Sequence, residues 1–332
     1  MSRFIHGWCL LFSLSLSLMC ACAEPMEGNQ ETAEPKQNVT TEAEENGNSR
    51  ALYVNGFASI LGDRAAEEKL LKFAASHELD VLLLYELHLV LDKDNAADRT
   101  HNNALANFIS TAKTEYGVKQ VAVTGESGGF FKDVIDPYNN SRPEANEKFD
   151  IYNLEFEFWI ESRIEDVYAD TYLVPNGLAS DANGAFEFFI SSLKEMRTLA
   201  DASSHDIRVE AYIGWTNVVS DRSQEEVEST IALNVDQLRL HAYRKKPDYG
   251  YAARRLEGLA ADDPDSALDV SILSSAEKEF MQDWLQSNGM EAAEAEFRKQ
   301  FDEAASDETK AGINLLGFTY YNYQHSIDVP VK

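Results

Sequence analysis

Short apolar runs and amphipathic segments alternate along the chain from about residue 51 onward. The apolar runs are rich in β-branched and aromatic residues, which is typical of strands. The segments between them repeat apolar positions every three to four residues, which is typical of helices. The runs predicted as strands are 51–57, 79–87, 118–125, 149–159, 207–215, 237–243, 268–273 and 315–323.

The intervening segments predict helices at 64–77, 102–116, 184–200, 224–231, 251–259 and 276–303. Strands alternating with helices in this number fit a (β/α)8 TIM barrel, for which about 280 residues is an ordinary length. A doubly wound open sheet is the main alternative, but no glycine-rich dinucleotide or Walker-type loop follows any predicted strand. The sequence therefore predicts an α/β protein with a single-domain (β/α)8 TIM barrel.

The fourth predicted strand carries an unusual load of polar side chains. If residues 149–159 are extended, Asn153, Glu155 and Glu157 share one face and apolar side chains occupy the other. Carboxylates on a central strand are costly unless they are paired, hydrated or used, and two glutamates at this spacing shift each other's pKa. Because a carboxyl group with a raised pKa can act as a general acid, this strand is the first candidate for catalysis.

The same strand resembles a known signature. The spacing of Asp150, Asn153, Glu155 and Glu157 is similar to the Asp-x-x-Asp-x-Asp-x-Glu motif on the fourth barrel strand of family 18 glycoside hydrolases, the chitinases and endo-β-N-acetylglucosaminidases. Asp150 and Glu157 match the motif. Asn153 and Glu155 stand where the family has aspartates.

Two later strands add to the resemblance. Residues 235–243 are similar to the sixth strand of that family, which ends in Met-x-Tyr-Asp, so Tyr243 stands at the tyrosine position and Arg244 replaces the acid. Residues 317–321 are similar to the eighth strand, which places Tyr321 where the family has a tryptophan under the bound sugar.

The resemblance implies a retaining, substrate-assisted glycosidase that cleaves glycans containing N-acetylglucosamine and has no enzyme nucleophile. In that mechanism Glu157 would protonate the leaving oxygen. Glu155 and Tyr243 would hold the acetamido group of the substrate, and Asn153 and Asp150 would support Glu155. Glu155 is one methylene longer than the family's aspartate, and a displacement of about one ångström can lower a rate ~100-fold.

Two alternatives remain open at this point. The first is a weak or inactive barrel that binds glycans at the cell surface, with Trp215, Tyr321 and Tyr323 as stacking surfaces. The second is a glycosidase with a different mechanism, in which Glu157 works with Glu210 of the fifth strand. A carboxylate separation of about 5–5.5 Å or 6.5–9.5 Å would favour that second mechanism.

The first 21 residues are predicted to be a signal peptide. Arg3 precedes an apolar run at 8–19, which is too short to span a bilayer. Export to a bacterial cell envelope, such as the outer membrane or the cell surface, is therefore expected.

The residues that follow this run predict an anchor and a tether. Ala21 before Cys22 resembles a bacterial lipoprotein cleavage box, which implies lipidation of Cys22, with Cys20 or an ordinary secretory signal as the alternatives. Residues 22–50 are acidic and nearly free of apolar side chains, as in a disordered tether. The barrel is then expected to occupy residues 51–332.

Composition excludes several classes of function. The net charge of −28 repels nucleic acids and anionic membranes, so membrane contact is expected only through the anchor, and a glycan is the expected ligand. No cysteine follows Cys22, which excludes thiol catalysis in the exported part. The histidines lack the spacing of a metal site, so neither a metal nor another cofactor is expected.

Overall fold

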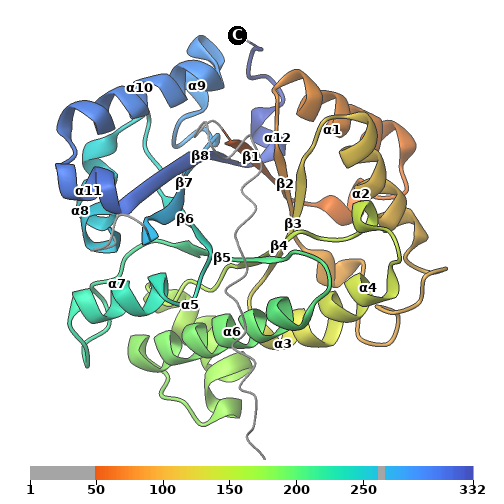
Figure 1. The fold of residues 1–332 in the computed structure, drawn as a ribbon, viewed down its shortest axis with the longest axis horizontal. Coiled ribbons are helices and arrows are strands. Elements are labelled where there is room, and N and C mark those ends of the chain that lie inside the picture. The colour runs from red at the N-terminus through yellow and green to blue at the C-terminus, as the bar shows by residue number, and fades with distance from the viewer. Residues whose placement is uncertain (1–48, 261–265, 332) are drawn as a thin grey trace, which may run out of the picture. The chain divides into compact units, whose positions relative to one another are not determined.

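The computed structural model describes residues 49–260 and 266–331. Within these residues eight parallel strands close into a barrel, in which each strand pairs with the next and the last pairs with the first (Figure 1). The predicted (β/α)8 barrel is therefore confirmed. The strands are β1 (Ser49–Val54), β2 (Val81–Leu84), β3 (Gln120–Gly125), β4 (Ile151–Leu154), β5 (Arg208–Ile213), β6 (Gln237–His241), β7 (Leu268–Ser275) and β8 (Ile313–Tyr321).

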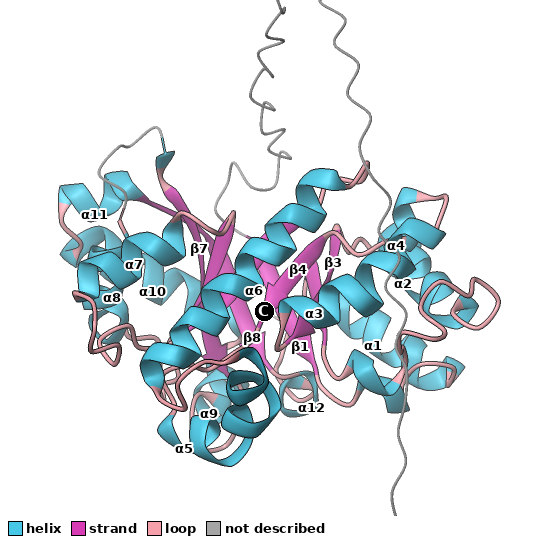
Figure 2. Ribbon diagram, turned by 90° about the horizontal axis from the view of Figure 1, so that it is seen from below, coloured by secondary structure: helices cyan, strands magenta, loops and turns pink. Residues whose placement is uncertain are grey.

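Helices surround the barrel on its outer side (Figure 1, Figure 2). The longer ones are α1 (Arg64–Ser76), α2 (Asn103–Glu115), α6 (Ala182–Ala202), α7 (Gln224–Ala232), α8 (Tyr249–Leu259) and α10 (Met290–Ala304). The shorter ones are α3 (Gly128–Phe130), α4 (Asp136–Ser141), α5 (Glu161–Arg163), α9 (Gln282–Asn288), α11 (Asp307–Gly312) and α12 (Tyr323–Ser326). In the described part of the chain, no helix is both long and apolar enough to cross a membrane.

Six further segments are single turns or wide helices. The 3-10 turns are η1 (Phe57–Ser59), η2 (Leu87–Leu89), η4 (Ala145–Glu147) and η6 (Val174–Asn176). Two segments have π-helical hydrogen bonding, η3 (Phe131–Ile135) and η5 (Ile164–Leu173). The amphipathic pattern did not predict η5, because its wider turn places residues on a period other than 3.6.

Local sequence explains where the main elements begin. All residues of β2 are buried, as expected for a parallel strand covered on both faces. Asp63 accepts hydrogen bonds from the first backbone amides of α1, and Ser223 with Glu226 forms a capping box at the start of α7. Such caps satisfy amides that have no partner within the helix.

Three predicted boundaries are corrected by the structure. The fourth strand ends at Leu154, so strand alternation does not place Glu157, which lies in the turn that follows. The helix predicted at 276–303 is two helices, because Gly289 has a φ of 83° between them. The last strand ends at Tyr321, and Tyr323 begins α12.

The barrel interior holds a network of buried polar side chains. Glu210 accepts hydrogen bonds from Asn153 Nδ2 at 2.6 Å, from Arg239 Nε at 2.6 Å and from Gln237 Nε2. Arg239 also donates to the hydroxyl of Thr319. The side chains of Glu210 and Arg239 are 0% and 3% exposed, so this ion pair is removed from water.

We expect Arg239→Met to lower the free energy of unfolding by about 3–5 kcal/mol, because it leaves the Glu210 carboxylate buried without its cation. The double variant Glu210→Gln, Arg239→Met removes both charges and should lose less. Denaturant unfolding followed by circular dichroism measures both. Equal midpoints for the single variant and the wild type would contradict a stabilising role of the pair.

Candidate active site at the carboxyl end of the barrel

Polar and aromatic side chains gather where the strands end. Because all eight strands are parallel, their carboxyl ends meet at one opening, which is where barrel enzymes carry their active sites. We call this opening the mouth. Its residues lie at or just beyond strand ends, or on the segment after β4: Asn55, Tyr85, Glu126, Glu155, Glu157, Arg163, Tyr212, Trp215, His241, Tyr243 and Tyr321.

Glu155 has the most perturbed carboxyl group of the mouth. Burial, and after it the nearby Glu157 and Glu126, raise its pKa to about 8 against the opposing effect of Arg163. Its Oε2 atom is buried and has no hydrogen-bond partner. At neutral pH Glu155 is therefore mainly a neutral carboxylic acid that retains a transferable proton.

Glu157 has a cationic neighbour. Arg163 Nε lies 3.3 Å from Glu157 Oε2, and the backbone amide of Glu157 donates to the hydroxyl of Tyr168 at 3.2 Å. Burial raises the pKa of Glu157, while Arg163 lowers it. Two neighbouring carboxyls thus differ in environment, one without a partner and one in an ion pair.

Two further polar pairs belong to the mouth. The Tyr172 hydroxyl donates to Glu126 Oε2 at 3.0 Å, and Asn55 Nδ2 donates to the Tyr321 hydroxyl at 2.7 Å. The Asn55 Oδ1 atom is buried without a partner. A bound molecule with a hydrogen-bond donor would satisfy this oxygen.

Aromatic rings line another part of the mouth. The His241 ring lies 4.3 Å from that of Tyr243 and 4.8 Å from that of Trp215, measured between centroids. Behind them, Arg255 lies 5.5 Å from the Trp215 ring and donates to the His241 carbonyl at 2.7 Å. Burial, and after it Arg255, lowers the pKa of His241 to about 4, so its imidazole is neutral at pH 7. Trp215 is 37% exposed and offers a ring face to a ligand.

The structure brings some predicted site residues together and separates others. Glu155, Glu157, Tyr243, Tyr321 and Trp215 all belong to the mouth. The remaining four predicted residues do not, and the reasons differ.

Asp150 lies just before β4, at the opposite end of the barrel. It pairs with Lys113 at 2.6 Å and with His205 at 3.1 Å, and it accepts from the amide of Val121. It therefore cannot support Glu155, as the resemblance implied.

Asn153 and Glu210 lie in the interior network, where each bonds to the other. Because Glu210 is fully buried and paired with Arg239, it is not available as a second catalytic carboxylate or a ligand contact. Tyr323 is 5% exposed and packs against Phe73 of α1 at 5.4 Å, so it offers no stacking surface.

Sequence reasoning missed several mouth residues. Asn55, Tyr85 and Glu126 directly follow β1, β2 and β3. Glu126 also follows the predicted strand 118–125, and this position after a strand end could have identified it, whereas Asn55 and Tyr85 were placed inside predicted strands that were too long. Arg163 follows no strand, and nothing in its sequence context indicated its role. Among the described residues, no group of three or more His, Cys, Asp or Glu side chains could hold a metal ion.

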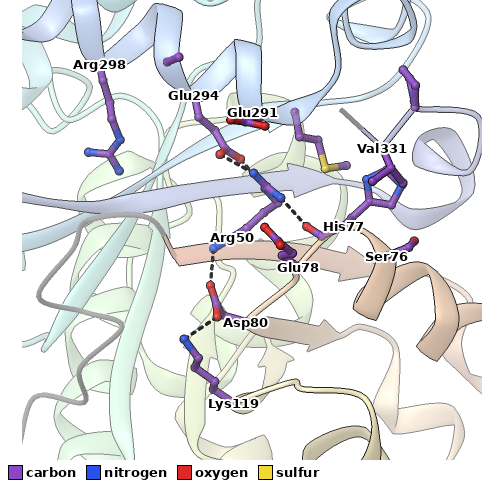
Figure 3. A pocket seen from close by; sticks show the side chains of 13 residues that line it. Arg50, Ser76, His77, Glu78, Asp80, Lys119, Glu291, Glu294, Arg298 and Val331 are labelled. Carbon is purple, nitrogen blue, oxygen red and sulfur yellow. Dashed lines mark hydrogen bonds and ion pairs between the residues drawn. The ribbon is translucent and has the colours of Figure 1, made fainter.

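A separate cavity of about 680 Å3 lies at the amino-terminal end of the barrel (Figure 3). Two ion pairs line it: Arg50 donates to both carboxylate oxygens of Glu294 at 2.6 and 2.7 Å, and Lys119 lies 2.9 Å from Asp80. Because these groups neutralise each other and bind α10 to β1, we read this cavity as structural.

Comparisons with known proteins show no family for this chain. No family model and no curated protein matches the chain. A 2,3-dimethylmalate lyase, described as a PEP mutase/isocitrate lyase superfamily member, is 10% identical with a TM-score of 0.40, covering 84% of this chain and 78% of its own. A putative lyase/mutase from Burkholderia cenocepacia J2315 is 10% identical with a TM-score of 0.39, covering 82% and 76%.

A GH39 enzyme from Xanthomonas axonopodis pv. citri is 9% identical with a TM-score of 0.48, covering 84% of this chain and 59% of its own. At these identities and scores the likeness assigns neither a family nor an activity to this chain.

The family 18 interpretation is therefore wrong. No family model matches the chain, the solved structures named above include no family 18 chitinase, and Asp150, one of the two residues that match the motif, lies at the end of the barrel opposite the mouth. The predicted chitinase-like activity on N-acetylglucosamine glycans is therefore wrong too, and so is the alternative of a weak or inactive barrel that acts as a glycan-binding surface lipoprotein. The predicted signal peptide, Cys22 and the tether up to residue 48 lie outside the described residues, whereas Ser49 and Arg50, the last two residues of the predicted tether, belong to β1. No comparison supports a lipoprotein.

The raised pKa of Glu155 predicts a pH-dependent stability. The folded chain holds this proton more tightly than the unfolded chain, whose pKa is near the ordinary 4.5. The stability gained is thus fully present below about pH 4.5 and is lost as pH rises through about 8.

We expect Glu155→Gln to gain stability relative to the wild type as pH rises, reaching a few kcal/mol at most, on the order of 1.4 kcal/mol per pKa unit. Denaturant unfolding between pH 4.5 and 9 measures the difference. Glu303→Gln, at an exposed site on α10, is the control and should follow the wild-type curve. A constant difference across this range would show that Glu155 titrates normally.

Proposed function

We propose that the protein is an enzyme that uses general acid–base catalysis at the mouth, with Glu155 as the acid and Glu157 as the base. The observation that carries this proposal is the contrast between the two carboxyls: Glu155 has a buried oxygen, Oε2, that lacks a partner, and Glu157 is paired with Arg163. Neighbouring carboxyls in such different environments are how proteins obtain an acid and a base at one pH.

The chemistry follows from the protonation states. Glu155 would donate its proton to an oxygen or nitrogen of the substrate, while the bonding electrons of the breaking bond move to that atom. Glu157 would take a proton from the group that attacks or is deprotonated. When a proton then passes back to Glu155, the two carboxyls together hold one proton again, as they did at the start. Each proton transfer typically contributes about 10²–10⁴-fold to a rate.

We further propose that the ligand is uncharged and bears hydroxyl or carbonyl groups. Glu126 and Glu157 make the mouth unfavourable for anions. A cation bound next to Glu155 would stabilise its ionised form and remove the acid's proton. The exposed face of Trp215 and the unpartnered Asn55 Oδ1 suit a molecule with both an apolar face and hydrogen-bond donors. A glycan is one member of this class, and nucleic acids are outside it.

The protonated acid can be tested before any substrate is known. We expect the infrared carbonyl band of a protonated carboxyl group in the wild type at pH 7, and its loss in Glu155→Gln. Substrates can then be sought by incubating the protein with neutral polyols, sugars and hydroxy-carbonyl compounds and recording NMR spectra.

For a compound that is converted, Glu155→Gln should lower kcat by about 10²–10⁴-fold, because its amide has no transferable proton. Tyr323→Phe, which changes a buried residue on the α1 side, is the control and should keep wild-type turnover. Wild-type turnover in Glu155→Gln, or an unchanged infrared spectrum, would reject Glu155 as the acid.

We also propose export to the cell envelope, because Arg3 and the apolar run at 8–19 are typical of a signal peptide. A chain without residues 1–21 should stay in the cytoplasmic fraction when expressed in a bacterium, while the full chain should leave it. Equal distribution of the two would contradict export.

A further inference from the structure

Between β4 and α6 the chain leaves the barrel wall and forms α5, η5 and η6, which we call the excursion. It contacts the carboxyl groups of the mouth at three points. Arg163 Nε lies 3.3 Å from Glu157 Oε2, the Tyr168 hydroxyl accepts from the Glu157 amide at 3.2 Å, and the Tyr172 hydroxyl donates to Glu126 Oε2 at 3.0 Å. The excursion therefore supplies partners that the barrel strands do not.

Aromatic packing holds the excursion in place. The Tyr168 ring stacks on Phe156, with centroids 4.0 Å apart and planes within 19°. The Tyr172 ring lies 5.1 Å from Phe188 of α6. Arg163 thus extends from an anchored backbone, although its own side chain is 50% exposed. Its position is set by the fold of the excursion and not by burial of the guanidinium.

Titratable groups from several elements act on the two carboxyls. Glu126 after β3 acts on Glu155, Glu157 and Arg163, and Tyr85 after β2 and Tyr168 on η5 act on Arg163. Glu155 in turn raises the pKa of tyrosines on four other elements or strand ends, which are Tyr53, Tyr212, Tyr243 and Tyr321. Within the described residues, Arg163 is the cation that acts on both Glu155 and Glu157. It contacts Glu157 directly, so its effect on that carboxyl is the greater one.

We propose that Arg163 is a positioning residue that decides where the proton of the mouth resides. By pairing with Glu157 it keeps that carboxyl ionised and leaves the proton on Glu155. Without it the two carboxyls would compete for one proton, and part of the population would hold it on Glu157, with acid and base exchanged. The inference rests on the proposed function, because the placement matters only if the proton is used.

The test is a titration of both carboxyls in the protein labelled with 13C at the glutamate side-chain carboxyl. Glu155→Gln and Glu157→Gln assign the two signals. In the wild type, Glu157 should ionise at a lower pH than Glu155. In Arg163→Gln the midpoint of Glu157 should rise by about one unit, at the lower end of what an adjacent opposite charge produces. Arg163→Lys keeps the charge and should restore most of the difference.

A matched control separates this effect from the general loss of a surface charge. Arg222 also makes an exposed ion pair, with Glu187 at 3.4 Å on α6, and Arg222→Gln should leave both midpoints unchanged. Circular dichroism of Arg163→Gln checks that the fold is intact. If that variant does not fold, Arg163→Lys and Arg163→Met are titrated in its place.

Failure of this inference and failure of the proposed function give different results. If Glu157 titrates at the same pH with and without the Arg163 charge, while Glu155 still holds its proton at pH 7, the positioning role is overturned and the acid–base proposal stands. If Glu155 is already ionised at pH 7 in the wild type, the acid–base proposal is overturned, whatever Arg163 does.

Discussion

Closure of a parallel barrel forces inward side chains from different strands to satisfy one another in a space without water. In this protein one layer of inward side chains inside the barrel satisfies its own polar groups. Asn153, Glu210, Arg239 and Thr319 bond to each other, and the buried carboxylate meets a buried guanidinium. Tyr53 joins the layer through a long hydrogen bond of 3.4 Å to Asn153.

The mouth is the next layer along the same strands. Along a strand every second side chain points inward. The next inward side chain therefore lies two residues after each member of the interior layer. Glu155 follows Asn153, His241 follows Arg239, and Asn55 follows Tyr53. Each of these three carries a buried atom without a partner, whereas the layer beneath is bonded. The chemistry of the mouth thus arises in the layer where inward polar atoms no longer have hydrogen-bond partners within the protein.

Strand alternation and helical periodicity were enough to predict the barrel and to place Asn153 and Glu155 on one face of its fourth strand. They failed where the backbone leaves regular structure. The strand ends at Leu154, so Glu157 obtains its position from the turn and from Arg163, which belongs to a wide helix with a different period. Tyr323 was assigned to a strand that ends two residues earlier.

Motif matching failed for another reason. A motif records residue types and their spacing along the chain. Asp150 fits the motif, but it lies at the end of the barrel opposite the mouth, where it forms an ion pair with Lys113. Asp150 therefore matches the motif in residue type but does not lie at the mouth of the barrel. Glu210 shows the same limit, because a carboxylate on an inward face can serve either an interior ion pair or a reaction, and only its partners decide.

The pairing of β1 with β8 has a consequence for how the chain acquires its fold. Arg50 at the start of β1 also bonds to Glu294, 244 residues later. The barrel can close only when nearly the whole described chain is present, and until then β1 and β7 have open edges that can pair with other chains. Contacts this distant in sequence make folding slow. We therefore expect the protein to be most prone to aggregation while its last strand is still missing.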